Sequence, residues 1–280
     1  LGMLDTSSVT IMNSMFSYCE GLKRLDLSNF DTSNVKDLAY MFSNCMLLEK
    51  IDVSSFIFDN VTDVTSMFDS CKNLKTIIFS DKLNTEKITN MMAMFQYCTS
   101  LEDLDLSMFS TVNVTDVQNM FYHCESLRTL DLSSFELPNM TNCGGMLDFY
   151  SNLDWIKTPF NVTQRIPFTA NCDLYDIDTL EKVTAVPAGD STSHTYAQSL
   201  ILPTTWKTEV NALLPSGKTV FNNLSRIYFF DDITQIEGAS VTYTNLGKLS
   251  TNIDVYYYEE EVVLAFYAPI KIKLPANSSN

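Results

Sequence analysis

Hydrophobic and polar positions along the first half of the chain recur with a fixed period. A cysteine returns every 26 or 27 residues, and a Met-Phe pair lies just ahead of each one. The cysteines are Cys19, Cys45, Cys71, Cys98 and Cys124, and Tyr150 takes the sixth place. Repetition of this length is typical of proteins whose units cannot bury their apolar faces alone and therefore stack.

Each repeat contains two apolar periodicities. In the first copy, the spacing of one helical face is followed by Val9, Met12, Met15, Phe16 and Cys19. Apolar Leu25 and Leu27 then alternate with polar residues, as in a half-buried strand. The pattern predicts an α/β solenoid over residues 1–165, in which six units of helical segment, turn and strand form a parallel sheet along one side.

One repeat is longer than the others by a residue. The extra residue falls near positions 80–83, where Ile77-Ile78-Phe79-Ser80 replaces the usual Leu-Asp-Leu-Ser. Because single insertions in repeats normally map to turns, we expect a local bulge there.

After about residue 165 the repeat ends and strand-like runs follow. Alternating β-branched and aromatic residues predict strands at 195–202, 219–221, 227–230, 240–244, 255–258, 262–267 and 270–274. Residues 205–214 predict a short helix with Trp206 and Val210 on one face. Residues 166–280 are therefore expected to form a smaller, mostly β C-terminal domain or cap. Both a small β-sandwich and a cap packed on the solenoid fit this pattern.

The charge balance limits the classes of partner. The formal net charge is −16, and the sequence pI is about 4.4. Binding to nucleic acid or anionic lipid needs clustered Lys and Arg, so neither partner is expected. The chain has no apolar run long enough to span a bilayer, and residues 1–4 show no signal-peptide pattern.

The cysteines invite several chemical interpretations. Because five occupy equivalent positions, their side chains run parallel, and we expect a buried ladder of reduced thiols rather than disulfides. No Cys-x-x-Cys pair occurs, and His123 and His194 are the only histidines, so no metal or cofactor is expected. His123 adjoins Cys124 but occupies a variable, surface position of the repeat. We therefore expect no catalytic site in the repeats.

The polar positions of the predicted strands are the candidate ligand-binding surface. Asp26, Asp52, Asp105 and Asp131 are equivalent, and Ile78 interrupts the row. One hypothesis is a ligand- or calcium-binding stripe. The alternative, which we favour, is that each Asp binds a neighbouring Ser, Thr or backbone N–H in a turn. With the charged and aromatic residues beside the row, the candidate residues are Arg24, Asp26, Lys50, Asp52, Asp103, Asp105, Arg128, Asp131 and Trp155.

Three glycosylation-type motifs share one repeat position. Asn60, Asn113 and Asn139 are each followed two residues later by Thr. Their equivalence favours a structural consensus over modification sites.

The repeat also resembles a known family. Asp31-Thr32-Ser33-Asn34-Val35, followed by Met41-Phe42, Cys45 and Leu48, is similar to the repeats of BspA-like leucine-rich surface proteins of bacteria. The resemblance covers about residues 1–160 and implies a right-handed leucine-rich-repeat array displayed outside the cell. Because Leu4 aligns with Phe30, the strand before the first repeat is missing, and we expect further repeats or a cap ahead of it.

These patterns predict a non-catalytic cell-surface module that binds or adheres. The resemblance implies a host matrix protein, a glycan or another bacterial surface as partner, and we expect an extracellular monomer. A structural spacer that displays another domain is one alternative. An enzyme with its site in the C-terminal half is a further alternative.

Overall fold

The computed structural model describes residues 4–148, 153–168, 174–176, 182–197 and 199–201, together with strands 226–230, 244–248, 254–258, 263–267 and 271–273. The chain divides into two compact units. Unit 1 comprises Leu1–Asp173 and Val183–Thr195, and unit 2 comprises Leu174–Lys182 and Tyr196–Asn280. The boundary expected at residue 165 stays a prediction.

The apolar segment of each repeat is a series of β-turns. In the second repeat Met41 N–H donates to Leu38 O (N···O 3.2 Å), and Cys45 N–H donates to Phe42 O (3.1 Å). The amides of Tyr40 and Phe42, on either side of Met41, donate instead to Thr65 O and Met67 O of the next repeat, at 2.8 and 2.9 Å. Every second N–H group therefore closes a turn within its own repeat, and the N–H groups that alternate with these donate to the next repeat.

The turns that end at Met41 and Cys45 have left-handed backbone at their third position. Tyr40 and Asn44 have φ values of 58° and 61°, as in type II turns. The equivalent residues of the other repeats are also at positive φ: Ser14, Tyr18, Ser66, Ser70, Ala93, Tyr97, Asn119, His123 and Gly145. In that series of turns only Gly145 is free of the side-chain penalty of this conformation.

The predicted helical segments are wrong, since the described residues contain no helix. A helix needs right-handed backbone throughout and an N–H bond four residues back, whereas these segments alternate in handedness and bond three residues back. The apolar spacing predicted a helix wrongly, because successive β-turns also bring residues i, i+3, i+4 and i+7 to one side of the chain. Leu38, Met41, Phe42 and Cys45 are all fully buried in this way.

The predicted continuous parallel sheet is also wrong. In unit 1, β1 (Lys50–Asp52) pairs in parallel with β2 (Thr76–Ile78), and β3 (Thr129–Asp131) pairs in parallel with β4 (Trp155–Lys157). No strand occurs between Phe79 and Arg128, a stretch described in full. The small separate sheets contradict the expected α/β solenoid, and the strand pairing stops where the 27-residue repeat carries its insertion.

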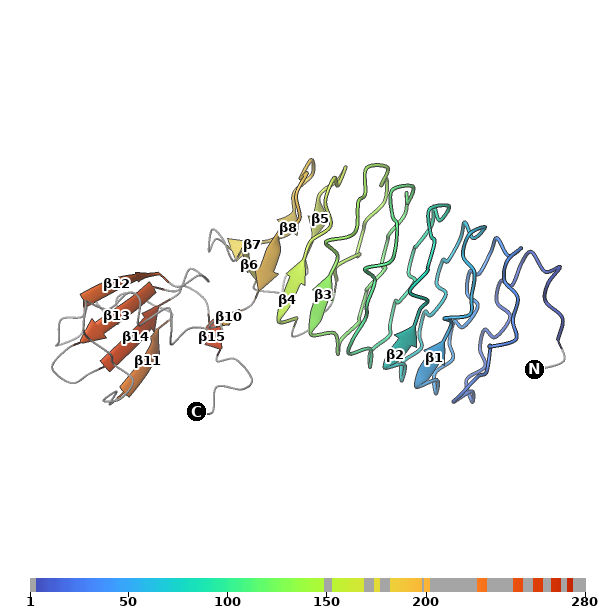
Figure 1. Cartoon of the computed structure of the whole chain (residues 1–280), viewed down its shortest axis with the longest axis horizontal. Coiled ribbons are helices and arrows are strands. Elements are labelled where there is room, and N and C mark those ends of the chain that lie inside the picture. The colour runs from blue at the N-terminus through green and yellow to red at the C-terminus, as the bar shows by residue number, and fades with distance from the viewer. Residues whose placement is uncertain are drawn as a thin grey trace. The chain divides into compact units, whose positions relative to one another are not determined.

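Successive repeats of unit 1 lie side by side (Figure 1), and isolated parallel bridges such as Asp37↔Asp63 and Asp63↔Asn90 join them. We refer to residues 4–148 and 153–168 as the repeat stack. Its interior contains a column of parallel rings with centroids 5.5–5.9 Å apart, formed by Phe16, Phe42, Phe68, Phe95 and Phe121. Full burial of one Phe contributes roughly 1.5–3 kcal/mol, and favourable ring contacts add about 0.5–1.5 kcal/mol.

The thiols form a second column in the repeat stack. Cys71, Cys98 and Cys124 are fully buried, and each Sγ donates to the carbonyl of a Phe in the preceding repeat at 3.1 Å. Cys19, in the first repeat, is exposed. The described cysteines are all free, which confirms the predicted thiol ladder from Cys45 to Cys124. Cys is suited to this position because it is small and apolar, yet offers a weak donor.

Short strands complete unit 1, and β7 (Lys182–Val183) and β9 (Thr195–Ala197) each run across the division between the units. In unit 1, β5 (Ile166–Pro167) pairs antiparallel with β8 (Ala185–Val186). Thr158, just after β4, binds the returning chain, since its Oγ1 accepts from His194 N–H at 2.9 Å.

Unit 2 contains a mixed four-stranded sheet in the order β11-β14-β13-β12. These strands are β11 (Arg226–Phe230), β12 (Thr244–Lys248), β13 (Asp254–Tyr258) and β14 (Val263–Tyr267). Two further pairs are β6 (Leu174–Asp176) antiparallel with β9, and β10 (Ser199–Ile201) parallel with β15 (Lys271–Lys273). The strands predicted at 227–230, 255–258 and 262–267 are confirmed. The predicted helix at 205–214 and strand at 219–221 lie outside the described residues.

The left-handed position at Gly145 generates a stability prediction. Gly145→Ala places a methyl group at φ 70° and against the Asn119 side chain, so we expect a loss of about 1–3 kcal/mol in the free energy of unfolding. Urea denaturation measures it. The control is Gly144→Ala, whose methyl group would meet only Asn142 Oδ1, at 3.9 Å. Equal stability of the two variants would contradict the turn assignment.

The thiol column generates a reactivity prediction. Burial raises the pKa of Cys45 to about 11 and raises the pKa of Cys71, Cys98 and Cys124 as well. N-ethylmaleimide at pH 7.5 should therefore label Cys19 in the folded protein and leave these four unmodified, as measured by peptide mass spectrometry. Labelling of Cys98 as fast as Cys19 would contradict the burial of the column.

The same shift has a consequence for stability. Because the folded pKa is raised, the contribution of these neutral thiols is complete below the ordinary thiol pKa of 9.0 and is lost as pH rises through and beyond the Cys45 value of about 11. The free energy of unfolding, measured by urea denaturation between pH 8 and pH 11, should therefore fall as the pH rises, and an unchanged value would contradict the buried, neutral state of the thiols.

Candidate binding surface

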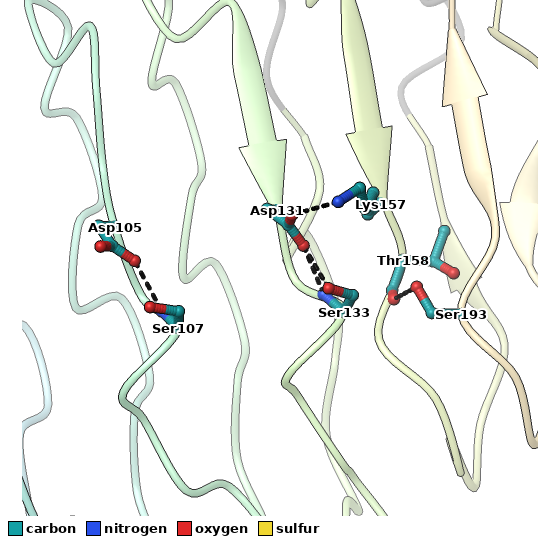
Figure 2. Close-up of polar contacts among 7 residues, drawn as sticks. All are labelled: Asp105, Ser107, Asp131, Ser133, Lys157, Thr158 and Ser193. Carbon is teal, nitrogen blue, oxygen red and sulfur yellow. Dashed lines mark hydrogen bonds and ion pairs between the residues drawn. The ribbon is translucent and has the colours of Figure 1, made fainter.

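The predicted Asp row follows the strand positions of the repeat stack, and each carboxylate is held by its own repeat. Asp52 Oδ1 accepts from Ser54 N–H at 3.0 Å and from Ser54 Oγ at 2.6 Å. Asp131 makes the same two contacts with Ser133, and Figure 2 shows it beside Asp105, which accepts from the N–H of Ser107 at 2.9 Å. Asp26 repeats the arrangement with Ser28. The favoured turn interpretation is confirmed.

These hydrogen bonds stabilise the charged form of the row. Donation from the serine hydroxyl, followed by the serine N–H, lowers the pKa of Asp26, Asp52 and Asp105. At Asp131 burial acts to raise the pKa, but donation from Lys157 and Ser133 outweighs it, so the pKa is lowered. The row therefore stays ionised at neutral pH.

Cross-repeat ion pairs gather at β3 and β4. Arg128 Nε and Nη2 donate to the Asp154 carboxylate at 2.9–3.1 Å. Lys157 Nζ donates to Asp131 Oδ2 at 2.7 Å (Figure 2) and lies 5.8 Å from the centroid of the Trp155 ring. The Arg128 and Lys157 side chains remain 53% and 44% exposed. We call these five residues the strand patch.

The structure brings three of the predicted site residues, Arg128, Asp131 and Trp155, into the strand patch. The other six are exposed on earlier repeats: Arg24, Asp26, Lys50, Asp52, Asp103 and Asp105.

Lys157 was not among the site residues predicted from the sequence, although the repeat contains a signal for it. Lys157 occupies the repeat position of the Asp row, 26 residues after Asp131, so the repeat alignment places a cation directly beside the last carboxylate.

The histidine next to a cysteine does not activate that cysteine. His123 Nδ1 lies 3.0 Å from Glu125 Oε1, and its ring stacks on Tyr97 with centroids 5.0 Å apart. Cys124 Sγ donates into the interior instead, and burial raises its pKa, so its thiol is held neutral. Within the described part of the chain, no three His, Cys, Asp or Glu side chains gather in a way that could hold a metal ion.

The asparagines of the glycosylation-type motifs are structural. The Nδ2 atoms of Asn60, Asn113 and Asn139 each donate to a backbone carbonyl of the preceding repeat at 2.8 Å. The nitrogen that would carry a glycan thus joins two repeats. The consensus interpretation is confirmed.

Comparison with known proteins gives one family. The model of the family described as "Mycoplasma protein of unknown function, DUF285" matches residues 1–81 and 49–160. No curated protein and no solved structure matches the chain. Among the described residues, no helix is long and apolar enough to cross a membrane.

The Asp turns generate a titration prediction. Ser54→Ala removes the hydroxyl donor to Asp52, so the pKa of Asp52 should rise toward its ordinary value in an NMR pH titration, while Ser28→Ala should move only Asp26. Because the native pKa is lowered, the stability from this turn is present above the ordinary Asp pKa and is lost as pH falls through the folded pKa. An unchanged Asp52 titration in Ser54→Ala would contradict the hydrogen-bond assignment.

Proposed function

We propose that this chain, which belongs to the DUF285 family, is a non-catalytic module that binds a partner at the cell surface. The family description assigns no function. The proposal rests on the strand patch and on the similarity of the repeat to BspA-like surface proteins.

The strand patch is the observation that carries the proposal. It presents a half-buried Trp155 with Lys157 Nζ 5.8 Å from its ring, together with the exposed Arg128, and each cation is already held by a carboxylate of a neighbouring repeat. Trp and Arg are enriched where binding energy concentrates. Side chains fixed in advance lose less conformational entropy on binding, so the patch is suited to recognition.

The BspA-like character of the repeat favours an extracellular location. We propose that the partner is a host matrix protein, a glycan or another bacterial surface, and that the chain binds it as a monomer. The net charge of −16 supports this choice, because it disfavours nucleic acid and anionic lipid.

A structural spacer is the second candidate function. The Asp row favours it, because one carboxylate oxygen of Asp26, Asp52 and Asp105 accepts from a serine of its own repeat. Carboxylates that take part in the turns of their own repeat have a structural role whether or not the surface binds a partner.

Substitutions in the strand patch (Trp155) and at the predicted site residue of β1 (Lys50) test the proposal. Lys50→Ala and Trp155→Ala should each weaken binding to immobilised collagen, laminin or an arrayed glycan, with Trp155→Ala losing at least about tenfold because buried aromatic anchors contribute on the order of 2 kcal/mol. Surface plasmon resonance measures the loss.

Lys72→Ala is the matched control, since it removes an exposed lysine outside the strands. Normal binding by both test variants would remove the site assignment. If the unmodified chain binds no member of the panel, the spacer is the better description.

A further inference from the structure

We propose that a second face of the repeat stack binds a neutral, linear polysaccharide. This face comprises a threonine column with an asparagine and lysine column beside it. We call it the threonine face, and its central residues are Thr62, Lys87, Thr89, Asn113, Thr115 and Asn139. It is separate from the strand patch and from the proposed function tested there.

The threonines are fixed in place by the preceding repeat. Thr89 donates both its N–H and its Oγ1 hydroxyl to Thr62 O, at 3.0 and 3.3 Å, and Thr115 donates both to Thr89 O, at 2.8 and 3.1 Å. Thr62 and Thr141 make the same pair of contacts with Lys36 O and Thr115 O. The hydroxyl bond to this carbonyl restrains the side-chain rotamer, and the N–H bond fixes the backbone beside it.

This geometry fixes what the threonines can offer to a ligand. A hydroxyl has one proton and two lone pairs, and here the proton is used within the repeat stack. Thr62 and Thr89 are exposed, so they present acceptor lone pairs to the outside, with their orientation set in advance. A ligand for this column must donate.

The neighbouring column offers the complementary groups. Asn113 and Asn139 each use Nδ2 to reach a carbonyl of the preceding repeat at 2.8 Å, which leaves one amide hydrogen and the Oδ1 acceptor. Lys87 Nζ donates to Asn60 Oδ1 at 2.8 Å and keeps further protons. Donors therefore stand beside the acceptors of the threonine column.

The surface is hollowed where the two columns meet. A shallow depression of about 530 Å³ is lined by Thr62, Glu86, Lys87, Thr89, Asn113, Thr115 and Asn139. This volume falls within the range of small-ligand sites. The lining spans several repeats, which lie roughly 4.8 Å apart where parallel backbone pairing joins them, so an elongated ligand fits it better than a compact one.

The chemistry of the depression points to a polyhydroxyl ligand. Glu86 and Lys87 carry opposite charges, which disfavours strongly anionic and strongly cationic ligands alike. A sugar hydroxyl both donates and accepts, so neighbouring hydroxyls can donate to threonine and accept from asparagine or lysine. A linear neutral polysaccharide repeats these groups along its length, as the repeat stack does.

Calorimetric titration of the intact chain with cellohexaose, xylohexaose and chitohexaose tests the proposal. We expect saturable binding of at least one of them. Thr89→Val with Thr115→Val keeps the side-chain shape but removes the acceptors, and should weaken binding at least about tenfold, because each lost hydrogen bond is worth a severalfold change. Thr10→Val, the same substitution in the same column outside the depression, should leave the affinity unchanged.

Circular dichroism establishes that each variant is folded. If the double valine variant does not fold, Lys87→Met provides the reading and should also weaken binding. Lys50→Ala and Trp155→Ala should bind the sugar normally, which separates this site from the strand patch. The proposal is overturned if none of the three oligosaccharides binds, if the folded double variant or Lys87→Met binds as tightly as the unmodified chain, or if Thr10→Val is weakened equally.

Discussion

The hydrogen bonds that join one repeat to the next are the constraint on which the repeat stack depends. Every second amide in the apolar segment donates to the neighbouring repeat, and the amides between them close turns at home. This division of donors leaves few amides unpaired, but it requires left-handed backbone at residues such as Tyr40 and Asn44. The stacked Phe rings and buried thiols follow, because the same register places equivalent side chains in line.

A register of this kind also repeats polar groups, and their remaining hydrogen-bonding capacity decides what they can do. In the Asp row, one oxygen of each carboxylate accepts from a serine of the same repeat, which gives the row a structural role. In the threonine column, only the proton is used, so acceptors remain outside. The strand patch differs again, because Lys157 takes the place of Asp in the row. Its Nζ donates to Asp131 and lies near the Trp155 ring.

Much of the repeat stack could be predicted from the sequence. The 26- and 27-residue register, the burial of Phe42 and Cys98, and the Asp turns depend on local chemistry and on equivalence between copies, which are readable in one dimension. The helices could not be predicted correctly, because apolar spacing reports which side chains face inward and does not report backbone handedness. The strand patch was found in part, since Arg128, Asp131 and Trp155 were identified but Lys157 was not.

By itself, the sequence determined the repeat, the acidic surface and the identities of the residues that lie in line. Only the tertiary structure decided how those residues are used. The carbonyls that accept from Thr89 Oγ1 and Cys98 Sγ belong to residues of the preceding repeat, 27 and 30 positions away in the sequence. Backbone handedness at each turn is likewise set by bonds to a neighbouring repeat. A residue's own segment carries no record of such partners, so the outward-facing chemistry emerges only once the repeats are stacked.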